Sequence, residues 1–356
     1  MTRRRGKLSP RVLVLPAILM IVAALYGGVA RAKIPPPGTH GVSKYWTEAD
    51  ADVTNFSPFA FNAAIGALTP GKHGGIWFGL GQTLEHIDRR GHMRNYQVSN
   101  EWLWEVSGIS YDGSGHLWFS LGQSGRIGTI DAHGETHTEV LVARRYFSDI
   151  RAIEFDSLGT LWFQDVGRRS VGRRTRSGHV KEIPVPRGDY PTSLEICNSR
   201  VWVAARGRQS NAIYFVRGNL HSLQRVKIQL PSGIVSIACD AQGTLWFADA
   251  AYQALSTVGY IDRRGLVHVQ TSFLFDERVH HGYRGSIWFS GFSAMSERDW
   301  TSSRLVLMHV SHGHQKAVTL PIGFAAFQNS LATTSDHALW LGLSFPESIV
   351  RLSFRH

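Results

Sequence analysis

The feature that most constrains this chain is a three-residue phrase with tryptophan at its centre, repeated along the sequence. The tryptophans are separated by 41, 44, 40, 44, 42 and 52 residues. A period in the low forties is typical of propellers built from four-stranded blades. The sequence therefore predicts an all-β fold, a seven-bladed β-propeller of four-stranded blades. The copies are Ile76-Trp77-Phe78, Leu117-Trp118-Phe119, Leu161-Trp162-Phe163, Val201-Trp202-Val203, Leu245-Trp246-Phe247, Ile287-Trp288-Phe289 and Leu339-Trp340-Leu341.

Each repeat divides into four expected strands. Asp-x-x-Gly turns precede three of the tryptophan strands, at 112–115, 156–159 and 240–243. In such turns Asp accepts local backbone hydrogen bonds and Gly tolerates a positive φ. Three adjacent apolar residues around each Trp favour a strand buried on both faces, as between two neighbouring blades. Segments such as 126–130 and 179–183 supply the third and fourth strands.

The two ends of the repeat region are incomplete in complementary ways. After Trp340 there is room for one more strand, residues 349–354. Residues 41–46 have the pattern of a fourth strand, yet no strands precede them. We expect residues 41–46 to pair in the blade that contains Trp340, so that an N-terminal strand closes the ring and removes exposed sheet edges. The propeller would then span residues 41–356, after a Pro-rich leader at 33–40.

The N-terminus has the pattern of an export signal. Five cations lie within residues 3–11, an apolar run begins at Val12, and Ala30-Arg31-Ala32 has the spacing that signal peptidase favours. Residues 1–32 therefore predict a signal peptide. The alternative is an uncleaved anchor, because residues 12–30 are uncharged and long enough to span a bilayer. Both interpretations place the propeller in the periplasm or outside the cell.

Composition narrows the classes of function. Removing the six cations of residues 1–32 lowers the formal net charge from +11 to +5. A mildly basic exported domain of this kind does not indicate a nucleic-acid-binding protein. The sequence has no Gly-rich phosphate loop, Gly-x-Ser-x-Gly elbow or His-Glu-x-x-His helix, so nothing in it indicates a nucleotide enzyme, serine hydrolase or zincin.

The two cysteines, Cys197 and Cys239, occupy the same place in successive repeats. Export permits a disulfide. Equivalent positions on neighbouring blades, however, tend to lie farther apart than the Cα separation of about 4.4–6.8 Å that a disulfide requires. The sequence thus favours two buried thiols, with a disulfide as the alternative.

The repeat unit resembles the virginiamycin B lyase (streptogramin lyase) family. The likeness rests on Gly-x-Leu-Trp-Phe followed about ten residues later by Ile-Gly-x-Ile, with residues 125–130 and 180–186 as the best local matches. It covers nearly all of residues 41–356. The resemblance implies a seven-bladed propeller, and enzymes of that family open a streptogramin lactone by elimination, using His, Glu and bound Mg²⁺. It also implies a site at the axial mouth, with His about eleven residues before the Trp and Glu three after it.

This chain departs from that pattern at both offsets. No His occupies the first and no Glu the second, so the proton-accepting imidazole of the family is missing from its usual place. Eleven before the tryptophans stand Gly66, Ser107, Arg151, Pro191, Val235, Glu277 and Asn329, and three after them stand Leu80, Leu121, Asp165, Ala205, Asp249, Gly291 and Leu343.

Charged residues at these offsets are the main candidate site. We expect Arg151, Asp165, Asp249 and Glu277 to converge at the mouth, where they could bind a polar ligand or a divalent cation. Asp165, Asp249 and Glu277 are the candidate metal ligands, for Mg²⁺ by the resemblance. The alternative is a structural ion pair between Arg151 and Asp165.

Other candidates are weaker. His280 and His281 lie seven to eight residues before Trp288, nearer the opposite face, and with Glu277 they are the candidates for a relocated catalytic group. Gln82 and Gln123 follow their tryptophans at one common offset and are candidate ligand-contacting amides.

The sequence favours a binding protein over an enzyme. We expect a monomer that binds a small molecule, a carbohydrate or a protein at the propeller mouth, with no nucleic-acid partner and with membrane contact only if residues 12–30 remain uncleaved. The alternative function is a metal-assisted carbon–oxygen lyase that opens a lactone with a rearranged site.

Overall fold

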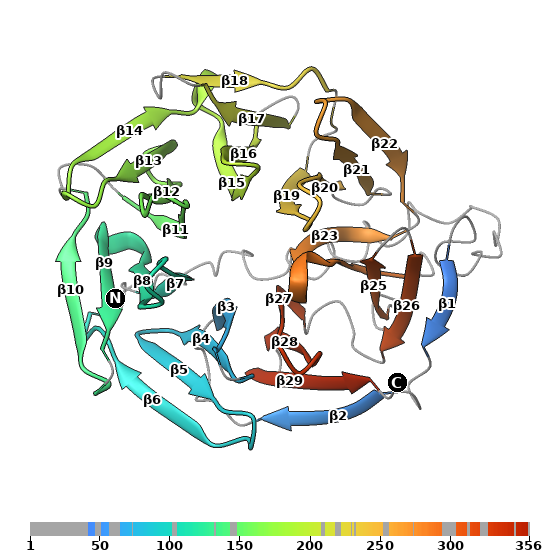
Figure 1. The fold of residues 1–356 in the computed structure, drawn as a ribbon, viewed down its shortest axis with the longest axis horizontal. Helices are drawn as coiled ribbons and strands as arrows, with labels where there is room; N and C mark the ends of the chain where they lie inside the picture. Colours follow the sequence, from blue (N-terminus) through green and yellow to red (C-terminus); the bar gives the residue numbers. More distant parts are fainter. Residues whose placement is uncertain are drawn as a thin grey trace, which may run out of the picture.

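The computed structural model arranges seven β-sheets around a central axis (Figure 1). Each sheet contains four antiparallel strands from the axis to the rim, and one sheet has a fifth, parallel strand at its outer edge. This confirms the predicted seven-bladed propeller. The structure describes residues 42–46, 51–56, 65–72, 74–101, 105–131, 133–142, 148–207, 211–217, 222–228, 230, 233–251, 256–272, 274–293, 304–311, 314–320, 327–344 and 347–354.

Blades one to three contain one tryptophan phrase each, in the second strand. They consist of β3 (Ile65–Pro70), β4 (Ile76–Leu80), β5 (Thr83–Ile87) and β6 (Met93–Gln97), then β7 (Val106–Tyr111), β8 (Leu117–Leu121), β9 (Arg126–Ile130) and β10 (Thr136–Val140), then β11 (Ile150–Phe155), β12 (Leu161–Asp165), β13 (Ser170–Arg174) and β14 (Val180–Pro184). Two short 3₁₀ helices, η2 (Gly122–Ser124) and η3 (Pro186–Gly188), lie in connections of this part of the ring.

Blades four to six repeat the arrangement. They consist of β15 (Tyr190–Cys197), β16 (Arg200–Arg206), β17 (Ala212–Val216) and β18 (Leu223–Arg225), then β19 (Gly233–Cys239), β20 (Leu245–Ala251), β21 (Thr257–Ile261) and β22 (Val267–Thr271), then β23 (Phe275–His281), η4 (Tyr283–Gly285), β24 (Ile287–Phe292), β25 (Leu305–Ser311) and β26 (His314–Leu320). Blade seven contains β27 (Phe327–Thr333), β28 (Leu339–Ser344) and β29 (Glu347–Phe354).

Strands from the start of the chain pair with two different blades. β2 (Ala51–Phe56) lies antiparallel to β29 and takes the outer place in the Trp340 blade, whereas β1 (Val42–Trp46) pairs parallel with β26 of blade six. The prediction that residues 41–46 pair in the Trp340 blade is therefore wrong. The physical reason is spacing: fourth strands end about ten residues or fewer before the next inner strand, a distance that β2 keeps from β3 and β1 does not.

The predicted signal or anchor and the leader at 33–40 lie outside the described residues. Among the residues that the structure does describe, no helix has the length and apolar character needed to cross a membrane.

The Asp-x-x-Gly turn and the tryptophan are joined by a hydrogen bond. In blade three, Asp156 Oδ1 accepts the backbone N–H groups of Leu158 and Thr160, while Oδ2 accepts the indole N–H of Trp162 at 2.9 Å. Equivalent indole bonds run from Trp118 to Asp112 at 3.2 Å and from Trp246 to Asp240 at 2.9 Å. One carboxylate thus fixes both the hairpin turn and the tryptophan rotamer.

The Ile-Gly-x-Ile motif has a packing explanation. Phe163 in β12 lies directly opposite Gly172 in β13, and a Cβ added at Gly172 would lie only 1.9 Å from the Phe163 ring. Phe119 with Gly128, and Phe247 with Gly259, form the same cross-strand pair. These phenylalanine rings are completely buried, so glycine is the residue that lets the ring lie flat over the third strand.

Polar side chains join neighbouring blades near the axis. The Thr69 hydroxyl donates to the Ile109 carbonyl at 2.8 Å, Ser120 to Ile150 at 3.0 Å, and Thr192 to Val235 at 2.7 Å. Each bond crosses from one blade to the backbone of the next inner strand. Because buried backbone groups need partners, these residues satisfy carbonyls that face a seam rather than a sheet.

The cysteines form a disulfide, contrary to the preference for thiols. Cys197 ends β15, Cys239 ends β19, and their Cα atoms lie 5.5 Å apart. Both stand on inner strands, where blades converge on the axis and equivalent positions come closer than farther out in the ring. The disulfide lies beside a buried apolar cluster that contains Trp202, Leu245 and Phe247.

The bond between turn and indole can be tested by isosteric substitution. Asp240→Asn should lower the free energy of unfolding by about 1–3 kcal/mol, because an amide cannot serve the backbone and the indole with two acceptor oxygens. Asp262→Asn is the matched control, since Asp262 makes the same turn contacts with Arg264 and Leu266 without an indole. Urea denaturation measures both, and equal losses would contradict the role assigned to the indole bond.

Removing the disulfide should destabilise the ring. The two cysteines are 42 residues apart, and for a loop of that length the chain-entropy model gives about 4 kcal/mol. The Cys197→Ser, Cys239→Ser double variant should therefore unfold at a clearly lower urea concentration than the oxidised protein. Thiol titration of the wild-type protein under denaturing, non-reducing conditions should find no free thiol, and two reactive thiols would overturn the assignment.

Candidate functional site

The mouth end of the inner strands is irregular. In six of the seven blades the pairing of the first and second strands shifts by one or two residues there, and only β19 with β20 keeps an unbroken register. In blade three Ile150 pairs with Asp165 and Ala152 with Gln164, which leaves Arg151 as the bulged residue. Bulges re-aim side chains and recur beside functional sites.

Arg151 does not pair with Asp165. Its Nε lies 3.0 and 2.8 Å from the two carboxylate oxygens of Asp149, two residues earlier. The Asp149 side chain is 9% exposed and that of Arg151 is 55% exposed. In the described part of the chain, the terminal nitrogens of Arg151 make no hydrogen bond. The alternative of an Arg151–Asp165 ion pair is therefore wrong. The ion pair with Asp149 holds the arginine at Nε and leaves the tip of its guanidinium accessible.

Asp165 is completely buried and its oxygens are already bonded. It accepts the Ser148 hydroxyl at 2.6 Å and the backbone N–H groups of Asp149 and Arg168, both at 3.0 Å. These contacts fix the connection that leads into β11 and the turn that follows β12. Asp165 thus supports the segment that carries Arg151 and does not face solvent itself.

Asp249 of blade five and Glu277 of blade six contact different neighbouring blades: Asp249 contacts Asn211 of blade four, and Glu277 contacts Ser256 of blade five. Asp249 pairs with Thr257 in the sheet and accepts the Asn211 amide at 2.7 Å, while the backbone N–H of Glu277 donates to Ser256. Burial raises the pKa of Asp249 to about 6 and that of Glu277 to about 8. Among the described residues, neither carboxyl oxygen of Glu277 meets the geometry of a hydrogen bond, and the nearby Ser272 hydroxyl only partly opposes the effect of burial on its pKa. Glu277 is thus mainly protonated at neutral pH.

The predicted metal ligands do not fit Mg²⁺. Among the described residues, none of Asp165, Asp249 and Glu277 belongs to a group of three ligand atoms within 4.8 Å of one another. All three side chains are fully buried, whereas Mg²⁺ usually keeps several of its waters. The three carboxylates stand in three different blades, and in the described part of the chain they do not form one cluster of ligand atoms.

The two glutamine candidates differ. Gln123 lies in η2, is exposed, and belongs to a segment that contacts β11. A Cβ built on the preceding Gly122 would come within 3.3 Å of an Asp149 oxygen. This places the Gln123 turn against the Asp149–Arg151 pair. Gln82 is half-buried in the corresponding connection of blade one.

The histidine candidates lie towards the other end of the axis, as expected. His280 pairs with Trp288, beside the turn between the first and second strands, and its Nε2 lies 2.7 Å from the Ser290 hydroxyl. Burial lowers the pKa of His280 to about 3, so its imidazole is neutral. His281 Nε2 lies 2.7 Å from Glu195 Oε1, and this carboxylate raises the pKa of His281 to about 9. At neutral pH His281 is therefore protonated and cannot act as a general base.

The His281–Glu195 pair was not anticipated from the sequence. It joins β23 to β15 past the intervening β19, and Glu154 on β11 interacts with the same two groups. Burial raises the pKa of Glu154 well above its ordinary value. A comparison of repeats could have found the cluster. Glu154 stands eight positions before its tryptophan, Glu195 and His281 stand seven before theirs, and the four other blades carry uncharged residues at both offsets.

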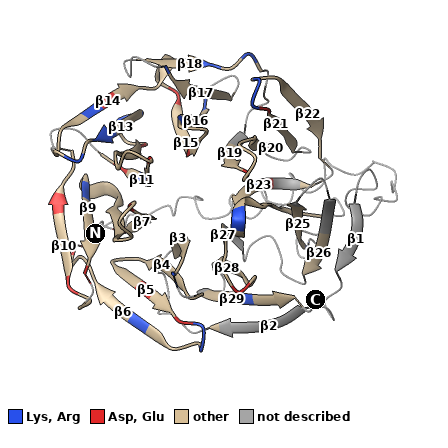
Figure 2. Cartoon of the chain, in the orientation of Figure 1, with Lys and Arg blue, Asp and Glu red and all other residues tan. Residues whose placement is uncertain are grey.

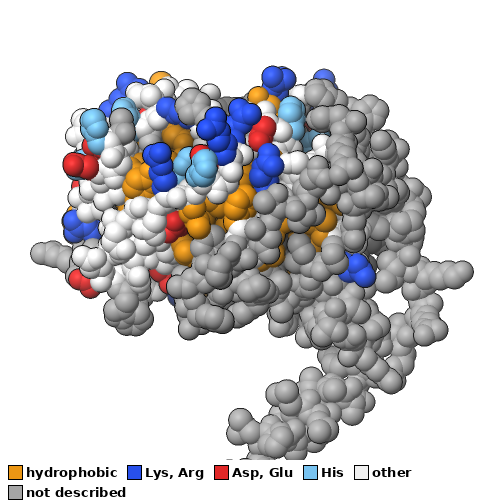
Figure 3. All heavy atoms as spheres, turned by 90° about the horizontal axis from the view of Figure 1, so that it is seen from below, with side chains coloured by type: hydrophobic (Ala, Val, Ile, Leu, Met, Phe, Trp, Pro, Cys, Tyr) orange, Lys and Arg blue, Asp and Glu red, His pale blue; other side chains and the backbone are white. Residues whose placement is uncertain are grey.

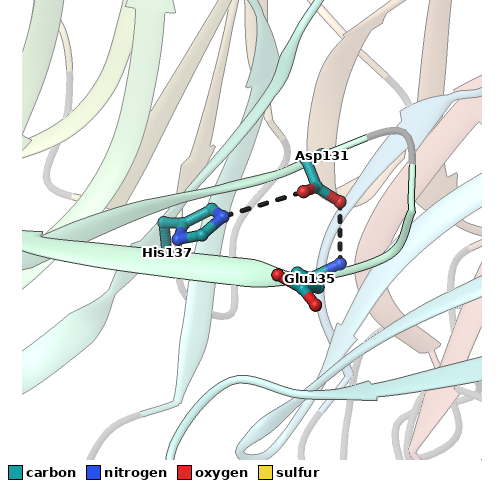
Figure 4. Close-up of side chains that lie close together, drawn as sticks. All are labelled: Asp131, Glu135 and His137. Carbon is teal, nitrogen blue, oxygen red and sulfur yellow. Dashed lines mark hydrogen bonds and ion pairs between the residues drawn. The ribbon is translucent and has the colours of Figure 1, made fainter.

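One further group of possible metal ligands is exposed. Asp131, Glu135 and His137 stand at the turn between β9 and β10 (Figure 4). Each offers one possible ligand atom, and these three atoms lie within 4.8 Å of one another. Asp131 accepts the backbone N–H groups of His133 and Glu135, both at 2.9 Å, and the Glu135 bond is the largest cause that lowers its pKa. Turn formation accounts for this arrangement.

Comparison with known proteins supports the architecture. No family model and no curated protein matches the sequence. A catalytically inactive virginiamycin B lyase from Staphylococcus aureus, crystallised with quinupristin, matches with a TM-score of 0.70 over 86% of this chain and 100% of that chain, at 17% identity. The chain shares the fold of virginiamycin B lyase. A streptogramin B lyase structure matches with a TM-score of 0.68, at 17% identity over 86% of this chain and 99% of that one.

Other propellers match as well. YCF48 bound to the D1 peptide has a TM-score of 0.61 at 13% identity, over 90% of this chain and 99% of that chain. At these identities the likeness concerns the fold, which hosts many functions.

Glu277 should make stability depend on pH. A carboxyl group whose pKa is higher in the folded protein loses stability as pH rises from about 4.5 to about 8. Glu277→Gln should remove this loss and raise the free energy of unfolding at pH 8 by an amount on the order of 3 kcal/mol, with little change at pH 4.5. Urea titrations across this range measure the effect. The exposed Glu135→Gln is the control, and a Glu277→Gln difference independent of pH would contradict the assignment.

Proposed function

We propose that this chain is an exported propeller that binds an anionic group of a ligand or partner protein at its axial mouth. The observation that carries the proposal is Arg151. It stands on a bulge of an inner strand, a buried carboxylate holds its Nε, and its terminal nitrogens are accessible. An arginine fixed in this way loses little side-chain freedom when it binds, and its fork matches a carboxylate or phosphate.

The surroundings of Arg151 support recognition rather than catalysis. The carboxylates near the mouth are buried and either bonded or protonated, so they do not compete for the guanidinium. The exposed Gln123 lies in a segment against the same pair and offers an amide to a ligand. The sequence has neither the His nor the Glu of the lyase pattern at the corresponding offsets.

Export is supported by two observations. Residues 1–32 have the pattern of a signal peptide or anchor, and the Cys197–Cys239 disulfide suits an oxidising compartment. We therefore propose the periplasm or the cell exterior as the location.

The proposal is tested with small anionic probes. Succinate, citrate and a short peptide with a free C-terminal carboxylate should raise the melting temperature of the wild-type protein, and Arg151→Gln should abolish the shift, since a ligand stabilises only the state that binds it. Arg94→Gln removes an exposed arginine from outer strand β6 and should leave the shift unchanged. If no probe stabilises the wild-type protein, or if Arg151→Gln responds equally, the proposal fails.

The alternative function, a lactone-opening lyase, rests on the shared fold. Incubation with quinupristin and Mg²⁺ should leave the compound intact. The reaction is followed by liquid chromatography, because elimination opens a lactone without changing its mass. Conversion above that of a heat-denatured sample would favour the lyase over the binding function.

A further inference from the structure

A second candidate site lies on the opposite face of the ring, which carries the turns between first and second strands. We call it the turn face. The turns 198–199, 240–244 and 282–286 of blades four, five and six are linked there. The Asn198 amide donates to the Gly243 carbonyl at 2.6 Å, and the Ala241 N–H donates to the Gly285 carbonyl at 3.0 Å. These hydrogen bonds join the three turns into one continuous surface on the turn face.

A small pocket opens at the seam of blades four and five. It measures about 100 Å³. Apolar groups from both blades line it, including Cys197 of the disulfide, Trp202, Leu245 and Ile261, and the arginines Arg200 and Arg263 also contribute. The disulfide connects the strands that precede both turns at this seam, and it therefore fixes the two walls relative to each other.

Both arginines are held in place without an acidic partner. The Arg200 guanidinium lies over the Trp202 and Phe215 rings, 5.5 and 4.6 Å from their centroids, while Arg263 Nε donates to the Gln242 carbonyl. Both side chains are exposed, and neither makes an ion pair with an acidic residue of the described chain. Stacking and a backbone bond orient them while their charge remains unbalanced.

The one acidic residue in the lining, Asp262, is engaged elsewhere. Its Oδ1 accepts the backbone N–H groups of Arg264 and Leu266, both at 2.9 Å, and Oδ2 lies 3.8 Å from His268. The Asp262 carboxylate thus interacts with its own hairpin and not with Arg200 or Arg263.

The surface around the pocket is positively charged, like the two arginines that line it. Arg264 and Arg284 lie exposed on the adjoining turns, and the Arg284 guanidinium lies over the Tyr283 ring. Basic residues occur on several blades around the ring (Figure 2). Figure 3 shows the other side of the ring from its edge, where Lys, Arg and His side chains are also exposed. An approaching anion would therefore meet a favourable potential.

We propose that this pocket binds the phosphate or sulfate group of a ligand between Arg200 and Arg263. Two guanidinium groups supply the charge-assisted hydrogen bonds that tetrahedral oxyanions favour. The apolar floor accepts a small hydrophobic group next to the anion. This site is separate from the mouth and from Arg151.

Three probes distinguish the possible sources of the anion. Inorganic phosphate tests the oxyanion alone, phenyl phosphate adds a ring for the apolar floor, and dextran sulfate represents a sulfated polymer. Calorimetric titration at low salt should show phenyl phosphate binding more tightly than inorganic phosphate. Tighter binding of dextran sulfate per sulfate group would assign the site to a polymer, and tighter binding of phenyl phosphate to a small ester.

Two pairs of variants distinguish binding in the pocket from a general effect of the protein's net charge. The Arg200→Gln, Arg263→Gln pair should weaken phenyl phosphate binding at least tenfold. The Arg89→Gln, Arg90→Gln pair makes the same charge change at the exposed β5–β6 turn of blade one and should alter binding less than twofold. Because Arg200→Gln also removes a stacking contact, Arg263→Gln alone provides a second measurement, with the melting temperature of each unliganded variant as the folding check.

Two results would contradict binding of a phosphate or sulfate group in this pocket. Failure of every probe to bind the wild-type protein at millimolar concentration, or equal loss in the two arginine pairs, would overturn the proposal. In an Arg151→Gln background, where the mouth no longer binds anions, the Arg200→Gln, Arg263→Gln pair should cause the same loss of phenyl phosphate affinity, so the results for the two faces can be told apart.

Discussion

The hydrogen bond between the turn aspartate and the tryptophan indole is the contact on which the blade depends. One oxygen of Asp156 closes the hairpin and the other fixes Trp162, so turn geometry and packing are set by a single side chain. Blade seven keeps the arrangement with different chemistry, because Thr334 accepts the Trp340 indole at 3.2 Å. With the rings of the second strand in place, the glycine of the third strand follows as a steric requirement.

Much of the fold could be predicted from these residues, since each residue repeated among the blades forms a turn or a packing contact within its own blade. Seven tryptophan phrases gave the number of blades, and the turn residues gave the order of the strands. Two features could not be derived in this way. The outer strand of blade seven depends on spacing from β3 rather than on an apolar pattern, and the disulfide depends on the convergence of inner strands at the axis.

The candidate site was predicted less well because its geometry depends on bulges. Counting from the tryptophan assumes an unbroken ladder, and a shift of one residue moved the partner of Arg151 from Asp165 to Asp149. The buried carboxylates at the expected offsets proved to be supports or protonated groups. The His281–Glu195 pair joins blades four and six, and no pattern within a single repeat reports a contact of that kind.

The two N-terminal strands give the molecule an ordered response to mechanical load. β1 lies on blade six, while β2, a few residues later, lies on blade seven. A pull on the N-terminus must separate β1 from β26 before tension reaches β2. The pairing of β1 with β26 therefore protects blade seven, which is built from both ends of the chain. Force reaches blade seven only after β1 has detached from β26.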